Sequence, residues 1–209
     1  MAMFRQVSLA CLAAALAAGA AGCGSSGGTG PLASDSAPTV VSEAMANTIA
    51  AQSVTITGGP TAALAVDLTI VHGLGCTGTI VQNSVQSTVI WIGKTVYARS
   101  TGMPANEWMR GTTTDPNLQG LLALCQPANM LAGLSASGFS DATRSATVYH
   151  GQPALSLTIP GSAQGSGKPG TVVVTDTASP VLLNISGSGP GSVTFSGYGA
   201  TKTIAPPAS

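Results

Sequence analysis

Charged side chains are scarce in this sequence, and so are aromatic rings. Only 7% of the 209 residues are charged, seven basic residues balance seven acidic ones, and 4% are aromatic. A soluble domain usually has about 25% charged residues. A nucleic-acid-binding surface needs concentrated basic side chains, so this balance argues against a nucleic-acid partner. Charge-driven disorder is also excluded, because it requires low hydrophobicity together with high net charge.

The sequence also has few groups that could perform chemistry. His72 and His150 are its only histidines, and its acidic residues are scattered along the chain. Residues 73–78, Gly-Leu-Gly-Cys-Thr-Gly, spell a dinucleotide-binding fingerprint, but a strand-like pattern follows where that motif needs a helix. We therefore interpret them as a hairpin turn. The sequence predicts no metal site, no cofactor and no enzymatic activity, and a hydrolase using either histidine is the least favoured alternative.

The N-terminal residues have the pattern of an export signal. Arg5 precedes an apolar stretch over residues 7–20, which is shorter than the roughly 20 residues of a membrane-spanning helix. The stretch ends in Ala-Ala-Gly-Cys23, which resembles a bacterial lipobox. We expect a signal peptide over residues 1–22, lipid attachment at Cys23 and a Gly/Ser tether over residues 23–37. This predicts a lipid-anchored protein on the extracytoplasmic face of the cell membrane; an ordinary cleaved signal is the alternative.

Two cysteines remain beyond the predicted anchor, Cys76 and Cys125. Extracytoplasmic compartments are oxidising, so an exported pair is expected to form a disulfide. Two buried free thiols are the alternative.

Residues 38–207 are expected to form one domain. A helical period covers residues 39–52, and a period of two then indicates about ten strands between residues 53 and 196. A short helical turn is expected at 104–110. After Asp115-Pro116, an apolar helix should run until Pro127 breaks or kinks it. These patterns predict an α+β domain with helices packed on one antiparallel sheet.

Several segments together resemble a known family. They are Gly75-Cys-Thr-Gly-Thr-Ile80, residues 91–98, Trp108-Met-Arg110, residues 148–155, 170–176, 180–183 and 191–199. In order and spacing they resemble actinobacterial envelope lipoproteins of the LppX/LprG type, which are related in fold to the LolA carrier. Asp176-Thr-Ala-Ser-Pro180 departs from the tighter Asp-Gly-x-Pro turn of that pattern. The resemblance implies a curved antiparallel half-barrel with helices on its concave face, and a non-catalytic carrier or binder of lipids.

A lipid carrier needs apolar side chains on the sheet and on the covering helices. The expected partners are a lipid or lipidated molecule and, as a further possibility, an envelope protein. If the core is solid instead of hollow, the alternative function is a protein-interaction or sensor-accessory module. The candidate cavity residues are Leu64, Val66, Leu68, Ile90 and Ile92 on the sheet, and Leu121, Leu122, Met130, Leu131 and Leu134 on the helical segment.

Overall fold

The computed structural model describes residues 30–208, except 62, 105, 161–169 and 188–190. The predicted signal peptide, Cys23 and most of the predicted tether lie outside the described residues. Within the described part of the chain, no helix combines the length and apolar content needed to cross a membrane.

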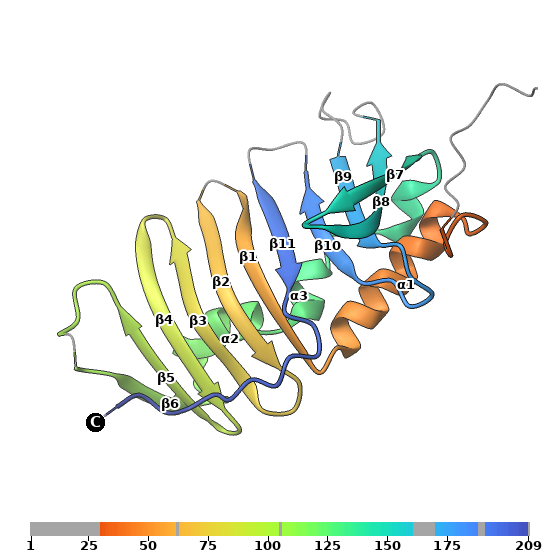
Figure 1. Ribbon diagram of the computed structural model, residues 1–209. Helices are drawn as coiled ribbons and strands as arrows, with labels where there is room; N and C mark the ends of the chain where they lie inside the picture. The colour runs from red at the N-terminus through yellow and green to blue at the C-terminus, as the bar shows by residue number, and fades with distance from the viewer. Residues whose placement is uncertain (1–29, 62, 105, 161–169, 188–190, 209) are drawn as a thin grey trace, which may run out of the picture.

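The described chain is mostly β-structure, with an open antiparallel sheet of eleven strands and a few helices (Figure 1). The sheet order is β6-β5-β4-β3-β2-β1-β11-β10-β9-β8-β7. The strands are β1 (Ser53–Thr61), β2 (Leu64–Val71), β3 (Gly75–Gln82), β4 (Val85–Ile92), β5 (Thr95–Ser100), β6 (Met109–Thr112), β7 (Thr143–Tyr149), β8 (Gln152–Ile159), β9 (Gly170–Thr175), β10 (Leu182–Ser186) and β11 (Ser192–Ser196).

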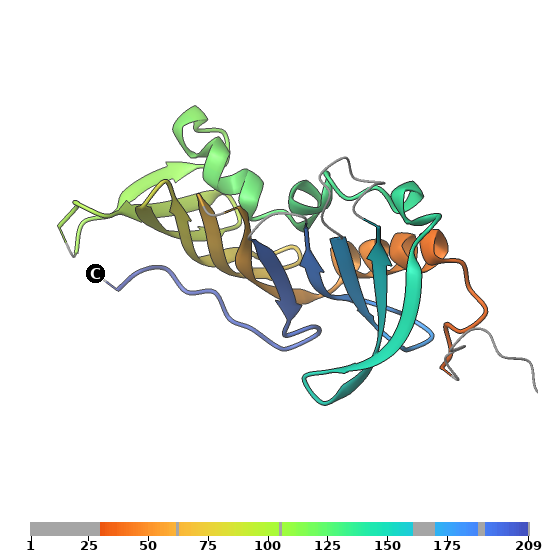
Figure 2. The same ribbon diagram turned by 90° about the horizontal axis from the view of Figure 1, so that it is seen from above.

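The helices occur at the start of the domain and between β6 and β7. They are α1 (Ala37–Ala50), α2 (Gln119–Leu124) and α3 (Pro127–Leu131), with short 3-10 turns at Pro116–Leu118 and Ala136–Phe139. The Ser36 side chain caps α1 by accepting from the Thr39 N–H, and Asp115 caps the first 3-10 turn. The predicted break at Pro127 is confirmed, because α2 ends before it and α3 begins on it. Figure 2 shows the helices on one side of the sheet.

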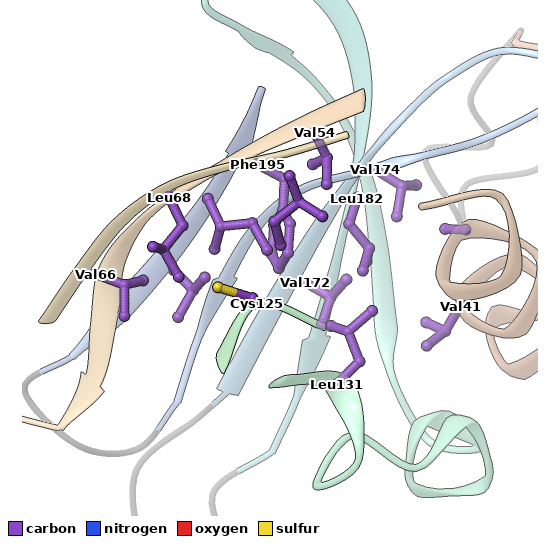
Figure 3. Close-up of a cluster of buried hydrophobic side chains, with 14 of the residues drawn as sticks. Val41, Val54, Val66, Leu68, Cys125, Leu131, Val172, Val174, Leu182 and Phe195 are labelled. Carbon is purple, nitrogen blue, oxygen red and sulfur yellow. The ribbon is translucent and has the colours of Figure 1, made fainter. Parts of the chain in front are cut away.

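The two faces of the sheet differ in composition. We call the face that carries Val54, Leu68, Val89 and Phe195 the inner face; these side chains join one buried cluster with Val41 of α1. Figure 3 shows side chains of this cluster, from the sheet and from the helices, pointing toward one another. The opposite, outer face is rich in threonine, because Thr55 of β1 pairs with Thr69 of β2 and Thr79 of β3 pairs with Thr88 of β4 on that face.

One predicted element is wrong. Residues 104–110, expected as a helical turn, contain one turn, in which the Glu107 N–H donates to the Pro104 oxygen at 3.0 Å, and then the start of β6, which pairs with β5 from Ala98↔Met109 to Thr95↔Thr112. The segment is short and does not alternate between apolar and polar residues, so its extended conformation depends on pairing with β5.

The folded part of the chain begins earlier than the predicted boundary at residue 38. Residues 30–36 form turns, and Leu32 is 3% exposed within the main cluster. The guanidinium of Arg144 donates to the backbone oxygens of Leu32 and Asp35, and an Asp176 carboxylate oxygen accepts from the Leu32 N–H at 3.4 Å. The last part of the predicted tether is therefore attached to the sheet.

Candidate functional site

An apolar pocket of about 310 Å³ lies where the β2–β3 turn meets the helical segment. We call it the end pocket. Its lining comes from the end of α1, the β2–β3 turn, the end of β4 and the α2–α3 junction. The residues are Ile49, Ile70, Val71, His72, Gly73, Leu74, Gly75, Trp91, Gly93, Cys125, Gln126, Pro127 and Ala128.

A disulfide fixes the helical side of the end pocket to its sheet side. Cys76 of β3 is joined to Cys125, with Cα atoms 5.7 Å apart, in the pairing that the sequence predicts. Both cysteines are buried. The α2–α3 junction is therefore tied covalently to the strand that runs beside the pocket.

Hydrogen bonds and close packing hold the turn side in place. The Gly93 N–H donates to the Leu74 oxygen at 3.0 Å, and Trp91 Nε1 donates to the Gly93 oxygen at 2.7 Å. At Gly75, with φ of 144°, an added Cβ would lie 1.9 Å from the Trp91 oxygen. The predicted hairpin turn is confirmed at residues 72–74, where it forms one wall of the pocket, but the predicted turn residues 75–78 belong to β3.

Two large apolar side chains of the lining are exposed. Leu74 is 52% exposed in the β2–β3 turn, and Ile49 is 37% exposed near the end of α1. Exposed apolar surface beside a pocket is typical of sites that bind an apolar group. His72 and Gln126 add polar groups to this otherwise apolar lining.

His72 is the acid–base group in the described lining of the end pocket. Among its described lining residues, none carries a hydroxyl or a carboxylate, and the Cys125 sulfur is bonded to Cys76. His150 lies elsewhere, in a pocket of about 570 Å³ between the β7–β8 hairpin and β11. Its ring contacts Tyr149 edge-on, with centroids 4.4 Å apart.

None of the ten predicted cavity residues lines the end pocket. Four of them are buried in the main cluster and at most 4% exposed: Val66, Leu68, Leu122 and Leu131. Side chains covered so completely pack against protein atoms and do not face an open cavity. Four others are partly buried against the same cluster: Leu64, Leu121, Met130 and Leu134.

The placement of Ile90 and Ile92 on the cavity side was wrong. They alternate along β4 with Val89, which is fully buried, and Trp91, which packs against the main cluster. Since successive strand residues point to opposite faces, Ile90 and Ile92 belong to the outer face. The prediction for β4 was therefore displaced by one residue, and a displacement of one residue exchanges the two faces of a strand.

The pocket residues that the sequence analysis missed lie in turns and helix ends. Half of the predicted cavity residues lie along the strands, whereas this pocket forms where the strands end. Leu74 is a signal in the sequence for this pocket. It is a large apolar residue between two turn glycines, and the turn itself does not require an apolar side chain there. The chain matches no protein-family model, and no match was found among curated proteins.

Proposed function

We propose that this protein binds an amphiphile non-covalently at the extracytoplasmic face of the cell membrane, to which a lipid on Cys23 anchors it. It carries or presents this molecule and catalyses no reaction. In this proposal the sheet acts as a LolA-like half-barrel, and the helices cover its concave face. The family resemblance and the lipobox-like sequence support the location.

The end pocket is the observation that carries the binding proposal. Its lining is mainly apolar, and its volume of about 310 Å³ lies at the small end of the range of about 300–1,000 Å³ for ligand pockets. A pocket of this size suits part of one acyl chain better than a whole lipid. Each buried methylene would contribute roughly 0.8 kcal/mol, so a short apolar segment is enough for measurable affinity.

The polar head of the amphiphile would stay near the exposed rim. Leu74 and Ile49 would cover the first carbons of the chain, while His72 and Gln126 could hydrogen-bond to the head. The disulfide would keep the helical wall in place when the pocket is empty.

A filled core favours a second candidate function, a protein-interaction module. Val66, Leu68, Leu122 and Leu131 pack tightly on the inner face where the sequence predicted a cavity. In that case the end pocket would be a surface depression, and the loops would contact another envelope protein.

Photo-crosslinking of the full-length protein in cells distinguishes these functions. Cells are fed a photoreactive fatty acid, and the purified protein is mapped by mass spectrometry. We expect crosslinks at the end pocket. Ala128→Trp should fill the pocket and abolish them, whereas Ala132→Trp, at the exposed position directly after α3 and outside the pocket, should leave them unchanged. Equal labelling of both variants, or no labelling of the wild type, would favour the interaction module.

The anchor is tested separately. Cys23→Ala should move the protein from the membrane fraction to the soluble fraction. If the variant stays in the membrane fraction, the anchor proposal fails, while the binding proposal remains open to the crosslinking test.

A further inference from the structure

The β7–β8 hairpin lies against the outer face of the sheet. Figure 1 shows its tip in front of β10, and Figure 2 shows it on the side of the sheet away from the helices. Beneath the hairpin, Ala154, Val173 and Leu183 form a second buried cluster, and Tyr149 packs against it. The hairpin is therefore attached to the outer face by apolar contacts.

A pocket of about 570 Å³ lies between the tip of this hairpin and β11. We call it the hairpin pocket. Its volume is well within the range of about 300–1,000 Å³ for ligand pockets. It shares no lining residue with the end pocket. The lining residues used below are Tyr149, His150 and Gln152 of the hairpin, Leu183 of β10, Thr194 and Ser196 of β11, and Tyr198 after β11.

The hairpin turn places an imidazole ring at this pocket. Tyr149 pairs with Gln152, so His150 and Gly151 are the two turn residues, and both have positive φ, of 49° and 84°. A turn of this type is usually built from Asn-Gly or Gly-Gly, and histidine is one of the few other residues that adopt positive φ. The turn itself does not require a ring. The His150 ring instead contacts Tyr149 edge-on and lines the pocket.

Hydrogen bonds fix the β11 side of the hairpin pocket. Asn184 Nδ2 of β10 donates to the Thr194 hydroxyl at 3.1 Å, and the Ser53 hydroxyl donates to the Gly197 oxygen at 2.9 Å. The Tyr198 phenol donates to a backbone oxygen of β10, so this residue offers only ring surface to the pocket. A wall that is ordered before binding lowers the entropic cost of holding a ligand.

The lining offers hydrogen bonds without a strongly charged group. None of its residues, all of which belong to the described chain, is aspartate, glutamate, lysine or arginine. In the described part of the chain, the side chains of His150, Gln152 and Ser196 make no hydrogen bond to the protein. An imidazole, a primary amide and a hydroxyl together present both donors and acceptors. Leu183 and the Tyr149 ring add apolar surface beside them.

We propose that the hairpin pocket binds a neutral saccharide. A sugar ring has hydroxyls that both donate and accept, and it also has a face of C–H groups. The hydroxyls would bond to His150, Gln152 and Ser196, and the C–H face would lie on the Tyr149 ring.

Other classes of ligand fit this lining less well. An acyl chain or a purely aromatic molecule would displace water from the amide and the hydroxyls without replacing their hydrogen bonds. A charged ligand would meet no carboxylate, ammonium or guanidinium group in the lining. The site is therefore distinct from the end pocket, and the proposal does not depend on the function of that pocket.

Saturation-transfer NMR of the full-length protein, held in nanodiscs of zwitterionic phospholipid, tests the proposal. The probes are neutral trisaccharides of different stereochemistry: maltotriose, cellotriose, mannotriose and chitotriose. Indole is the apolar aromatic comparator, and nanodiscs without protein give the baseline. We expect saturable binding of at least one trisaccharide and no binding of indole at the hairpin pocket. The Kd of the trisaccharide that binds most tightly is then compared among variants.

Two variants remove single hydrogen-bonding groups. Gln152→Ala and His150→Gly should each weaken binding roughly three- to tenfold, as expected for the loss of one hydrogen bond. Glycine adopts positive φ freely, so His150→Gly retains the turn. Gln86→Ala removes the same amide at an exposed β4 position outside the pocket and should leave the Kd unchanged.

A second pair of variants tests the location. Ser196→Trp should fill the hairpin pocket and abolish binding. Ser192→Trp, at the exposed first position of β11 and outside the pocket, should leave binding unchanged. The far-ultraviolet circular dichroism and urea midpoint of each variant show whether it is folded, and if Ser196→Trp is not, Gln152→Ala and His150→Gly still decide the result.

Three results would overturn the proposal. They are absence of saturable binding of every trisaccharide, binding of indole that is lost in Ser196→Trp, and equal losses of trisaccharide binding in Gln86→Ala and Gln152→Ala. Each of them leaves the crosslinking test of the end pocket unaffected, so failure of this proposal is distinguishable from failure of the proposed function.

Discussion

The Thr48 hydroxyl, inside α1, accepts a hydrogen bond from the Leu182 N–H of β10 at 3.0 Å. Thr48 is fully buried. Its hydroxyl is 3.3 Å from the phenol oxygen of Tyr198, which donates to the Leu182 oxygen. Because the phenol has one proton, Thr48 must donate to Tyr198. The side chains of Thr48 and Tyr198 and the backbone of Leu182 thus join α1, β10 and the segment after β11.

Thr48→Val should destabilise the protein, because it leaves the Leu182 N–H without its acceptor in a buried site. The expected loss is about 1–3 kcal/mol in the free energy of unfolding. Urea denaturation measures it. Ser42→Ala, which also removes a hydroxyl but at an exposed α1 position, is the control and should change stability by less than about 0.5 kcal/mol. Equal effects of the two substitutions would show that the buried network is not what stabilises this contact.

Tyr198 should make the protein less stable in alkali. Burial raises the pKa of its phenol well above the ordinary value of about 10, and the Thr48 hydrogen bond opposes this only in part. Above about pH 10 the unfolded chain loses this proton while the folded chain keeps it, so unfolding becomes more favourable as pH rises. Below that pH the group has no such effect.

Urea titrations at a series of alkaline pH values test this. Tyr198→Phe should be less stable than the wild type at neutral pH, because the hydrogen bond to Leu182 is lost. Its stability should nevertheless fall less steeply in alkali. Parallel pH profiles for the two proteins would contradict the assignment to Tyr198.

The Cys76–Cys125 disulfide closes a loop with a sequence separation of 49 residues. In the chain-entropy model, removing it costs roughly 4 kcal/mol. The double variant Cys76→Ala/Cys125→Ala should therefore unfold at lower urea than the wild type. A reductant present during unfolding should lower the wild-type midpoint and leave that of the double variant unchanged. If the reductant lowers the urea midpoint of both proteins by the same amount, it does not act through this disulfide.

Arg144 should stabilise the N-terminal turn of the domain. Its guanidinium holds the backbone oxygens of Leu32 and Asp35 and so keeps Leu32 buried. Arg144→Met should cost roughly 1–2 kcal/mol, because the side chain is partly exposed and water can replace part of the interaction. It should also speed limited proteolysis near residue 32. Arg110→Met, at an exposed β6 position, is the control and should leave the cleavage rate unchanged.

Local patterns were enough to predict most of this sheet. Alternating residues and turn glycines predicted β2 to β5 and the connections between them, and the spacing of Val41, Ala44 and Thr48 predicted α1. These signals are strong because each element buries one face against the same core. β6 was missed because its four residues are ordered by pairing with β5.

The site was harder to predict than the fold. Alternation shows that a strand has two faces, but it does not show which face meets the helices. At Ile90 and Ile92 that choice depends on Val89, whose burial is a tertiary fact. The end pocket joins Leu74 to Ala128, which are far apart in the sequence, so no local pattern could have brought them together.

The two tryptophans give one fluorescent reporter inside the end pocket and one outside it. Trp91 lines the end pocket, whereas Trp108 lies against the Arg99 guanidinium and is not part of that lining. Trp91→Phe and Trp108→Phe thus leave one reporter each. A brominated fatty acid quenches indole fluorescence on contact. In the nanodisc-held protein it should quench Trp91 in Trp108→Phe and leave Trp108 in Trp91→Phe nearly unaffected.

Quenching of Trp91 should disappear when Ala128→Phe is added to Trp108→Phe, because the ring fills the pocket and phenylalanine adds no indole fluorescence. If the fatty acid quenches Trp108 as strongly as Trp91, the amphiphile does not select the end pocket.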